Sequence, residues 1–167
     1  MNIKEFYRDK TIFITGTTGF VGKVVLEKIL RSLPDFKRIY IMVRPKKGMN
    51  NEQRIDEIFR SELFTTYFNL NPHMRKEWTN KVAPIAGDLT LSGLGLSQTD
   101  RDILLNEVQI IINSAASVNF DDPLLDALNI NYFGCMRILD IAQKSKSVIC
   151  FTHVSTAYVN SDRSGRI

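Results

Sequence analysis

Short runs of β-branched and other apolar residues alternate along the chain with longer stretches in which apolar residues recur every three to four positions. The short runs are typical of buried strands, and the longer stretches are typical of amphipathic helices. The predicted strands are Thr11–Thr15, Arg38–Val43, Lys81–Ala86, Val108–Ile112 and Val148–His153. The predicted helices are Phe20–Ser32, Asn51–Phe64, Ser97–Asn106 with Ser97 as its cap, and Leu124–Lys144. This alternation predicts an α/β fold with a doubly wound parallel sheet that is cut off after about the fifth strand.

Prolines and short polar residues refine the element boundaries. Pro84 removes a hydrogen-bond donor from the third predicted strand, which places that strand at an edge of the sheet. Ser97 and Asp100, three residues apart, resemble a capping box with Asp in place of the usual Glu or Gln. Asp122 and Pro123 predict an N-cap and a first helical residue for the last helix.

Length and composition fit a soluble globular protein. A chain of 167 residues corresponds to about one domain, so we expect residues 1–167 to form one. The longest apolar run, Ile39–Val43, is five residues, whereas a membrane-spanning helix needs about 20. The N-terminus lacks the apolar core of a secretory signal, which favours an intracellular, reducing compartment. We expect Cys135 and Cys150 to be small buried residues without a disulfide.

The net charge of +4 favours an anionic partner. Nucleic acid, a membrane surface and a phosphorylated cofactor are all compatible with this charge, so the positions of the basic residues decide among them. In the basic segment Arg-Pro-Lys-Lys at residues 44–47, no aromatic residue is interleaved with the basic ones, which argues against nucleic acid.

A glycine-rich segment, TGTTGFVG at residues 15–22, lies between the first predicted strand and the first predicted helix. In this context it predicts a Rossmann-like turn that binds the pyrophosphate of a dinucleotide through backbone N–H groups and the helix N-terminus. Its spacing has one residue more than the common G-x-G-x-x-G pattern, and an ordinary glycine-rich turn is the alternative interpretation. The residues predicted to bind the cofactor here are Thr15, Gly16, Thr18, Gly19, Phe20, Val21 and Gly22.

Arg44 lies twenty-two residues beyond Gly22, at the end of the second predicted strand. An NAD-specific site carries an acid there for the ribose 2′-hydroxyl, whereas an arginine can bind the 2′-phosphate of NADP. Lys46 and Lys47 follow closely, and we include Lys47 in the predicted site. The sequence therefore predicts NADPH rather than NADH, with a solvated basic loop as the alternative.

Two further segments follow predicted strands at the edge where ligands collect in such sheets. Asp88 and Leu89 follow the third strand, and Asp88 is placed to accept a hydrogen bond from the adenine amino group. Ser114, Ala115 and Ala116 follow the fourth strand, and their small side chains leave room for a ribose. Simple turn chemistry would also explain both segments.

The ordered set of motifs resembles a known family. TGTTGFVG, IYIMVRPKKG, NSAASVNFDDPL and HVSTAYVN are similar to segments of extended short-chain dehydrogenases/reductases, and more narrowly of the alcohol-forming fatty acyl-CoA reductases. The resemblance spans essentially the whole chain. It implies an oxidoreductase that uses NADPH to reduce a long-chain acyl-CoA to a fatty alcohol through an aldehyde.

The resemblance also implies catalytic residues. Thr156, or its neighbour Ser155, matches the catalytic hydroxyl of the superfamily, which stabilises negative charge on the carbonyl oxygen. Asn131 matches the helix asparagine that shapes the active site, although a solvent-facing helical residue is the plainer interpretation. His153 and Ser155 lack an orienting acid, so we expect no nucleophilic triad, and the two cysteines lack metal-ligand spacing.

One feature of the family is missing from this chain. The family takes its proton from a tyrosine followed four residues later by a lysine, and no tyrosine here has that partner. The tyrosines are Tyr7, Tyr40, Tyr67, Tyr132 and Tyr158. We therefore expect residues 1–167 to be the N-terminal, NADP-binding part of a longer reductase, without the substrate domain and nearly inactive alone.

Three functions are compatible with these residues. The leading one is the NADPH-binding part of a fatty acyl-CoA reductase. The alternatives are a reductase of carrier-protein-bound thioesters and a non-catalytic NADP-binding sensor or remnant. The family often works at the cytoplasmic side of peroxisomal or endoplasmic-reticulum membranes, through C-terminal segments absent here, and the sequence does not indicate an oligomeric state.

Overall fold

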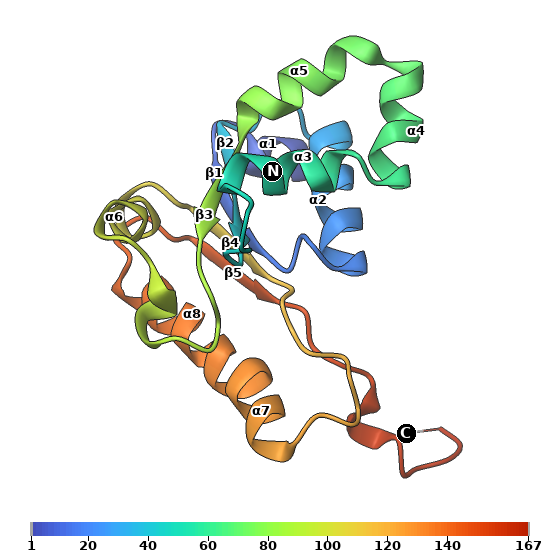
Figure 1. The fold of residues 1–167 in the computed structure, drawn as a ribbon, viewed down its shortest axis with the longest axis vertical. Coiled ribbons are helices and arrows are strands. Elements are labelled where there is room, and N and C mark those ends of the chain that lie inside the picture. The colour runs from blue at the N-terminus through green and yellow to red at the C-terminus, as the bar shows by residue number, and fades with distance from the viewer. Residues whose placement is uncertain (1, 167) are drawn as a thin grey trace.

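A five-stranded sheet forms the centre of the protein, described here by a computed structural model of residues 2–166. Its strands are β1 (Thr11–Thr15), β2 (Arg38–Val43), β3 (Val82–Ala86), β4 (Ile110–Asn113) and β5 (Cys150–His153). Their order is β3-β2-β1-β4-β5, and every neighbouring pair is parallel (Figure 1). The predicted α/β, doubly wound sheet is confirmed. The chain changes direction across the sheet between β1 and β4, which is where such folds bind ligands.

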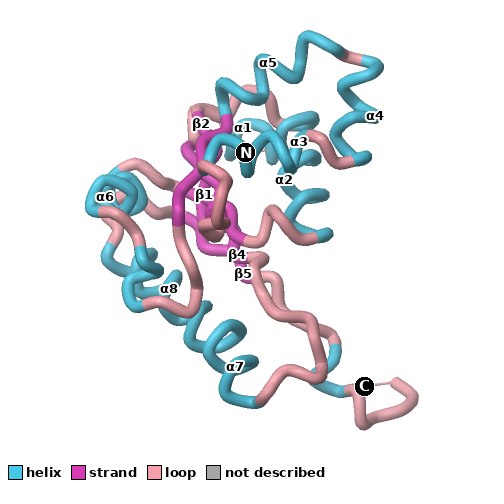
Figure 2. The backbone as a smooth tube through the Cα atoms, viewed as in Figure 1, coloured by secondary structure: helices cyan, strands magenta, loops and turns pink. Residues whose placement is uncertain are grey.

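Helices cover both faces of the sheet (Figure 2). On one side lie α1 (Ile3–Tyr7), α2 (Phe20–Ser32), α3 (Asn51–Phe59), α4 (Glu62–Leu70) and α5 (Pro72–Lys81). On the other lie the 3₁₀ helix η1 (Ser92–Gly95), α6 (Gln98–Asn106), α7 (Leu124–Leu128), the π-helix η2 (Asn129–Phe133) and α8 (Gly134–Lys144). The short 3₁₀ helix η3 (Tyr158–Asn160) follows β5. Two separate hydrophobic cores result, one on each face of the sheet.

The predicted helix over residues 51–64 is wrong in extent, because three helices occupy this connection. α3 ends at Phe59, Ser61 caps α4, and Pro72 begins α5. The three helices pack an aromatic cluster in which the Phe59 and Phe64 ring centroids are 5.0 Å apart, and Trp78 is almost fully buried. These aromatic side chains therefore pack inside the protein.

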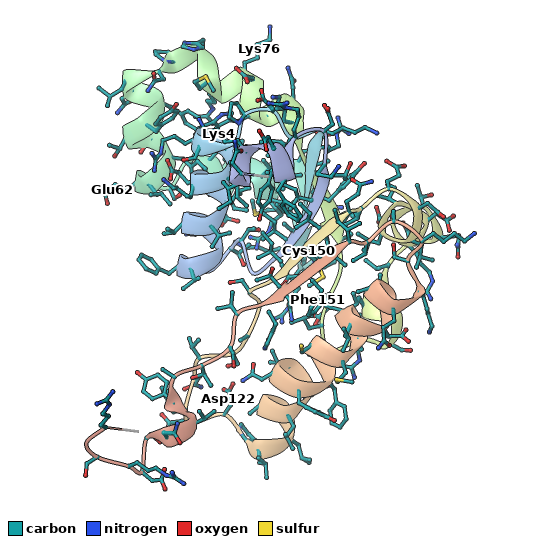
Figure 3. The ribbon with its side chains drawn as sticks, turned by 180° about the vertical axis from the view of Figure 1, so that it is seen from behind. Lys4, Glu62, Lys76, Asp122, Cys150 and Phe151 are labelled. Atoms are coloured by element: carbon teal, nitrogen blue, oxygen red, sulfur yellow. The ribbon has the colours of Figure 1, made fainter. Side chains whose placement is uncertain are left out.

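The last predicted helix is also interrupted. Residues 124–144 form α7, the π-helix η2 and α8 in direct succession. Pro123, not Asp122, occupies the N-cap position of α7. The Asp122 carboxylate instead accepts hydrogen bonds from the Ser117 hydroxyl and from the Asn119 side-chain amide at 2.7 Å. Asp122 therefore braces the preceding loop at the end of the molecule remote from the sheet (Figure 3).

The cap of α6 and the edge strands of the sheet agree with the sequence, whereas the burial of the cysteines does not. Ser97 caps α6 as expected, because its hydroxyl accepts a hydrogen bond from the Asp100 backbone N–H at 3.1 Å. β3, with Pro84, is an edge strand, and β5 is the opposite edge. Cys150 and the neighbouring Phe151 on β5 belong to opposite faces of the sheet (Figure 3). Cys135 and Cys150 are only half-buried, which corrects the expectation of full burial.

Candidate functional site

A cleft of about 450 Å³ opens at the carboxyl ends of β1 to β4. Most residues predicted to bind a cofactor line this cleft. They are Gly16, Thr18, Gly19, Phe20, Val21, Gly22, Arg44, Asp88, Leu89, Ser114, Ala115 and Ala116. The fold thus brings together four segments that are far apart in the sequence, each of them the connection after a parallel strand.

Two glycines in the first of these connections are required by close packing. Gly16 has φ +80°, and a Cβ there would lie 2.7 Å from the backbone nitrogen of Ala115. A Cβ on Gly22 would lie 2.2 Å from the carbonyl oxygen of Gly16. Gly16 therefore packs on the loop after β4, while Gly22 packs on its own turn rather than on the strand.

The N-terminus of α2 faces the cleft with unsatisfied backbone donors. Gly19 is the N-cap and supplies no side-chain acceptor, and the first turn contains no acidic residue. Free N–H groups and the positive end of the helix dipole favour an anion at this position. Phe20, which is 83% exposed, and Val21 present apolar surface beside those donors.

Thr15 does not line the cleft but organises its floor. Its side chain is fully buried, and its hydroxyl lies 2.6 Å from the Asn113 side-chain oxygen. The same hydroxyl oxygen accepts hydrogen bonds from the backbone N–H groups of Ser114 and Ala115, at 3.2 and 3.1 Å. Thr15 therefore holds the loop after β4 against the glycine turn.

Arg44 and Asp88 are joined by an ion pair across the ends of β2 and β3, with Arg44 Nε 3.0 Å from Asp88 Oδ2. Asp88 Oδ1 accepts hydrogen bonds from the Thr90 backbone N–H at 2.9 Å and from its hydroxyl at 2.8 Å. Burial raises the pKa of the Asp88 carboxyl, but the two Thr90 hydrogen bonds and the Arg44 charge outweigh it, so the pKa lies below its usual value.

Arg54 lines the same cleft and was not predicted from the sequence. Its side chain is only 12% exposed, and one end of its guanidinium pairs with Glu57. The signal was its position four residues before the buried Ile58, which places both on one face of α3. Lys47, which was predicted, is exposed and does not line the cleft, while its neighbour Lys46 pairs with Glu57 at 3.3 Å.

Within residues 2–166, three buried side-chain polar atoms have no hydrogen-bond partner, and all belong to segments around this cleft. They are Thr17 Oγ1, Arg54 Nε and Ser114 Oγ. Buried polar groups in proteins are nearly always paired, so each of these points to a missing partner. Together with the glycine cradle and the open helix N-terminus, they fit a polyanionic dinucleotide.

The segments after β4 and β5 run side by side away from the sheet (Figure 1, Figure 2), and the Phe120 and Tyr158 ring centroids are 5.5 Å apart. Ser155 and Thr156 lie exposed in the second segment, outside the cleft lining. The Thr156 hydroxyl accepts a hydrogen bond from the Tyr158 backbone N–H at 3.1 Å.

Asn131 is exposed to solvent, but its side chain is held in place by hydrogen bonds to the loop after β4. Its Oδ1 accepts from the Ser117 backbone N–H at 2.8 Å, and its Nδ2 donates to the Ser117 carbonyl oxygen at 3.1 Å. Asn131 lies in the π-helix η2, and π-helical turns are frequent at functional sites. Within the described residues, the Asn131 side chain makes no hydrogen bond to Ser155 or Thr156.

His153 takes part in a contact that the sequence did not indicate. Its Nδ1 lies 3.2 Å from the Asn113 side-chain nitrogen and 3.7 Å from Cys135 Sγ. His153 and Asn113 are also register partners across β4 and β5. The side chain thus faces the end of β4 rather than Ser155.

An NAD-binding family model described as "Male sterility protein" matches residues 14–167. The chain belongs to this family. Curated relatives include fatty acyl-CoA reductase 1 of Xenopus laevis, 40% identical, and that of Mus musculus, 39% identical, each over 98% of this chain. The family resemblance found in the sequence is confirmed, as is binding of a nicotinamide dinucleotide. The chain spans 31% of the length of each of these two relatives.

A solved structure agrees with the fold of this family member. The reductase domain of a nonribosomal peptide synthetase from Mycobacterium tuberculosis superposes with a TM-score of 0.71 at 30% identity, over 92% of this chain and 34% of that one. The chain thus covers only part of that reductase domain. Within residues 2–166, no helix has both the length and the apolar character needed to cross a membrane.

Proposed function

We propose that residues 1–167 form the NADPH-binding domain of a reductase that converts a long-chain fatty acyl-CoA to a fatty alcohol through the aldehyde. The observation that carries this proposal is the cleft, in which a glycine turn and a helix N-terminus face two arginines from β2 and α3. The names of the curated relatives, fatty acyl-CoA reductases, support the substrate class.

The phosphorylated cofactor is preferred because Arg44, directly after β2, and Arg54, in α3, both line the cleft. Among the described residues, Arg44 contacts Asp88 through Nε, so both of its Nη groups are available to a phosphate. Arg54 contributes a buried Nε with no partner. Two guanidinium groups can bind a 2′-phosphate through charge-assisted hydrogen bonds, whereas an uncharged 2′-hydroxyl offers them no negative charge to bind.

Other residues would contact the parts of the cofactor beyond its phosphates, and the substrate. NADPH, when bound, would supply the hydride, and each of the two reductions, of the thioester and then of the aldehyde, would consume one NADPH. Asp88 would accept from the adenine amino group, and Ser114 to Ala116 would border a ribose. Asn131 would shape the nicotinamide end, and Thr156 or Ser155 would donate a hydrogen bond to the carbonyl oxygen as it gains negative charge.

A second candidate is reduction of a thioester held on a carrier protein. The likeness to the reductase domain of a nonribosomal peptide synthetase favours it. Both candidates need the same cofactor half. A reading frame that continues past Ile167 into a Tyr-x-x-x-Lys pair would support either reductase, and a stop codon there would support a non-catalytic NADP-binding sensor.

The cofactor assignment is tested by measuring dissociation constants for NADPH and NADH by titration calorimetry. Arg44→Ala should weaken NADPH binding about ten- to a hundredfold, the factor for loss of a charge-assisted hydrogen bond, and should leave NADH binding nearly unchanged. Arg54→Met should also weaken NADPH binding more than NADH binding. Lys37→Met, which removes an exposed charge just before β2, is the control. Equal loss for both cofactors would refute the assignment.

A further inference from the structure

Arg137 of α8 reaches two segments that are far apart in the sequence. Its Nη1 donates to the carbonyl oxygen of Leu89 at 2.6 Å and to that of Asn129 at 3.2 Å. Its Nη2 donates to the Asn129 side-chain oxygen at 3.0 Å. One guanidinium group therefore binds three oxygen atoms, and a planar fork of donors is suited to such a contact.

Both segments border the cleft. Leu89 directly follows Asp88, lines the cleft and is almost fully buried. Asn129 begins the π-helix η2, which also contains Ile130 of the cleft lining and Asn131. Arg137 is thus a direct link between the loop after β3 and the helical turn that carries Asn131.

The π-helical turn depends on how its first carbonyl is paired. The Gly134 backbone N–H donates to the Asn129 carbonyl oxygen, five residues back, and Arg137 donates to that same oxygen. Gly134 also lets α8 approach the loop closely, because a Cβ there would lie 2.9 Å from Leu89 Cβ. If this turn reverted to α-helical pairing, residues before it would rotate by about 100° per residue shifted, which would carry Asn131 away from Ser117.

We propose that Arg137 is a positioning residue that holds η2 in its π-helical register against Leu89, so that Asn131 is aimed at Ser117. Through this clamp, a ligand in contact with Asp88 and Leu89 stabilises the orientation of Asn131, which follows Ile130 of the cleft lining in η2. The first part of the proposal is a property of the chain alone, and only the coupling to a ligand rests on the proposed function.

The test measures hydrogen exchange of the Ser117 backbone N–H by NMR, in the protein without cofactor. Arg137→Met keeps the length of the side chain and removes its donors, and it should speed exchange at Ser117 about tenfold. Arg137→Lys, which keeps one charged donor, should give a smaller increase. Arg101→Met is the matched control, because Arg101 lines the same surface groove as Arg137 and its side chain makes no hydrogen bond or ion pair within residues 2–166.

A double-mutant cycle separates positioning from a general loss of stability. Asn131→Ala removes the acceptor for the Ser117 N–H, so adding Arg137→Met to it should not speed exchange at Ser117 further. The Val154 N–H, which donates to the Asn113 carbonyl oxygen at 2.9 Å, reports on the sheet and should be unaffected by Arg137→Met. Unchanged exchange at Ser117, or equal acceleration at Ser117 and Val154, would overturn the proposal.

A second measurement tests the coupling to a ligand. NADPH should slow exchange at Ser117 in the wild type, and this protection should be reduced severalfold in Arg137→Met at equal cofactor occupancy. Equal protection in both proteins would refute the coupling. Failure of NADPH to bind at all would refute the proposed function while leaving the exchange data in the cofactor-free protein to decide the role of Arg137.

Discussion

The Nε of Arg44 lies 3.0 Å from Oδ2 of Asp88, so the two charged residues expected to contact separate parts of a dinucleotide contact each other. The Thr90 hydrogen bonds to Oδ1 fix the other side of the carboxylate. Asp88 is therefore held in one orientation, and it in turn holds the Arg44 guanidinium at the carboxyl end of β2. Under the proposed function, this ion pair would orient the arginine for a phosphate before any ligand arrives.

A pH dependence of stability follows from the lowered pKa of Asp88. The unfolded chain binds a proton at the ordinary aspartate pKa of about 3.9, whereas the folded protein binds it only at lower pH. Stabilisation by Asp88 is thus complete above that pKa and is lost as the pH falls through the folded value. Urea unfolding of wild type and Asp88→Asn should show a stability difference that grows from about pH 2 to pH 5 and then levels off. Parallel curves over this range would contradict the assignment.

The glycine turn offers a matched pair of substitutions. Gly16 and Gly48 both have φ +80°, but a Cβ at Gly48 has no atom within 4 Å, whereas one at Gly16 meets the backbone of Ser114 and Ala115. Gly48→Ala should cost about 1 kcal/mol of unfolding free energy from backbone strain alone. Gly16→Ala should cost about 1–3 kcal/mol more from the clash and should weaken NADPH binding. Chemical denaturation measures both, and equal losses would mean that the close approach of the two loops is not required.

Much of this fold could be read from the sequence, because each strand is a short apolar run bounded by polar residues or glycine. The sheet order placed the glycine turn, Arg44, Asp88 and the loop after β4 around one cleft, as parallel topology requires. These features depend on the period of hydrophobic residues and on backbone geometry, which are local properties of the chain.

Other features depend on tertiary contacts that local patterns do not contain. The π-helix at Asn129 depends on Arg137 and on the packing of Gly134 against Leu89, contacts that only the folded chain provides. Asp122 resembles a helix cap in sequence, yet Ser117 and Asn119 compete successfully for its carboxylate. Half-burial of the cysteines follows from their places on the edge strand β5 and on α8, which composition does not encode.

The buried hydroxyl of Thr15 allows a second matched substitution. Thr15→Val keeps the shape of the side chain but leaves the Ser114 and Ala115 N–H groups and the Asn113 amide without this partner. Because unpaired buried polar groups are costly, the unfolding free energy should fall by about 2–4 kcal/mol. Thr11→Val in the same strand is the control, since the Thr11 side chain makes no hydrogen bond within the described part of the chain. The unfolding free energies are measured by thermal and chemical unfolding. Equal losses for Thr15→Val and Thr11→Val would argue against a special role for Thr15.

The same hydroxyl determines the tautomer of His153. Thr15 Oγ1 accepts two backbone N–H groups, so its single proton is donated to Asn113, and the atom that it meets must be the amide oxygen. The amide NH₂ of Asn113 therefore faces His153 Nδ1 at 3.2 Å, which requires that nitrogen to be an acceptor and places the proton on Nε2.

This tautomer can be observed by ¹⁵N NMR of the neutral imidazole rings. His153 should show an unprotonated Nδ1 and a protonated Nε2, whereas the exposed His73 serves as an internal reference that averages between tautomers. Thr15→Val should relax the preference, because the Asn113 amide is then free to turn over. A protonated Nδ1 in the wild type would show that the hydrogen-bond chain from Thr15 does not extend to β5, since two donors cannot face each other at this distance.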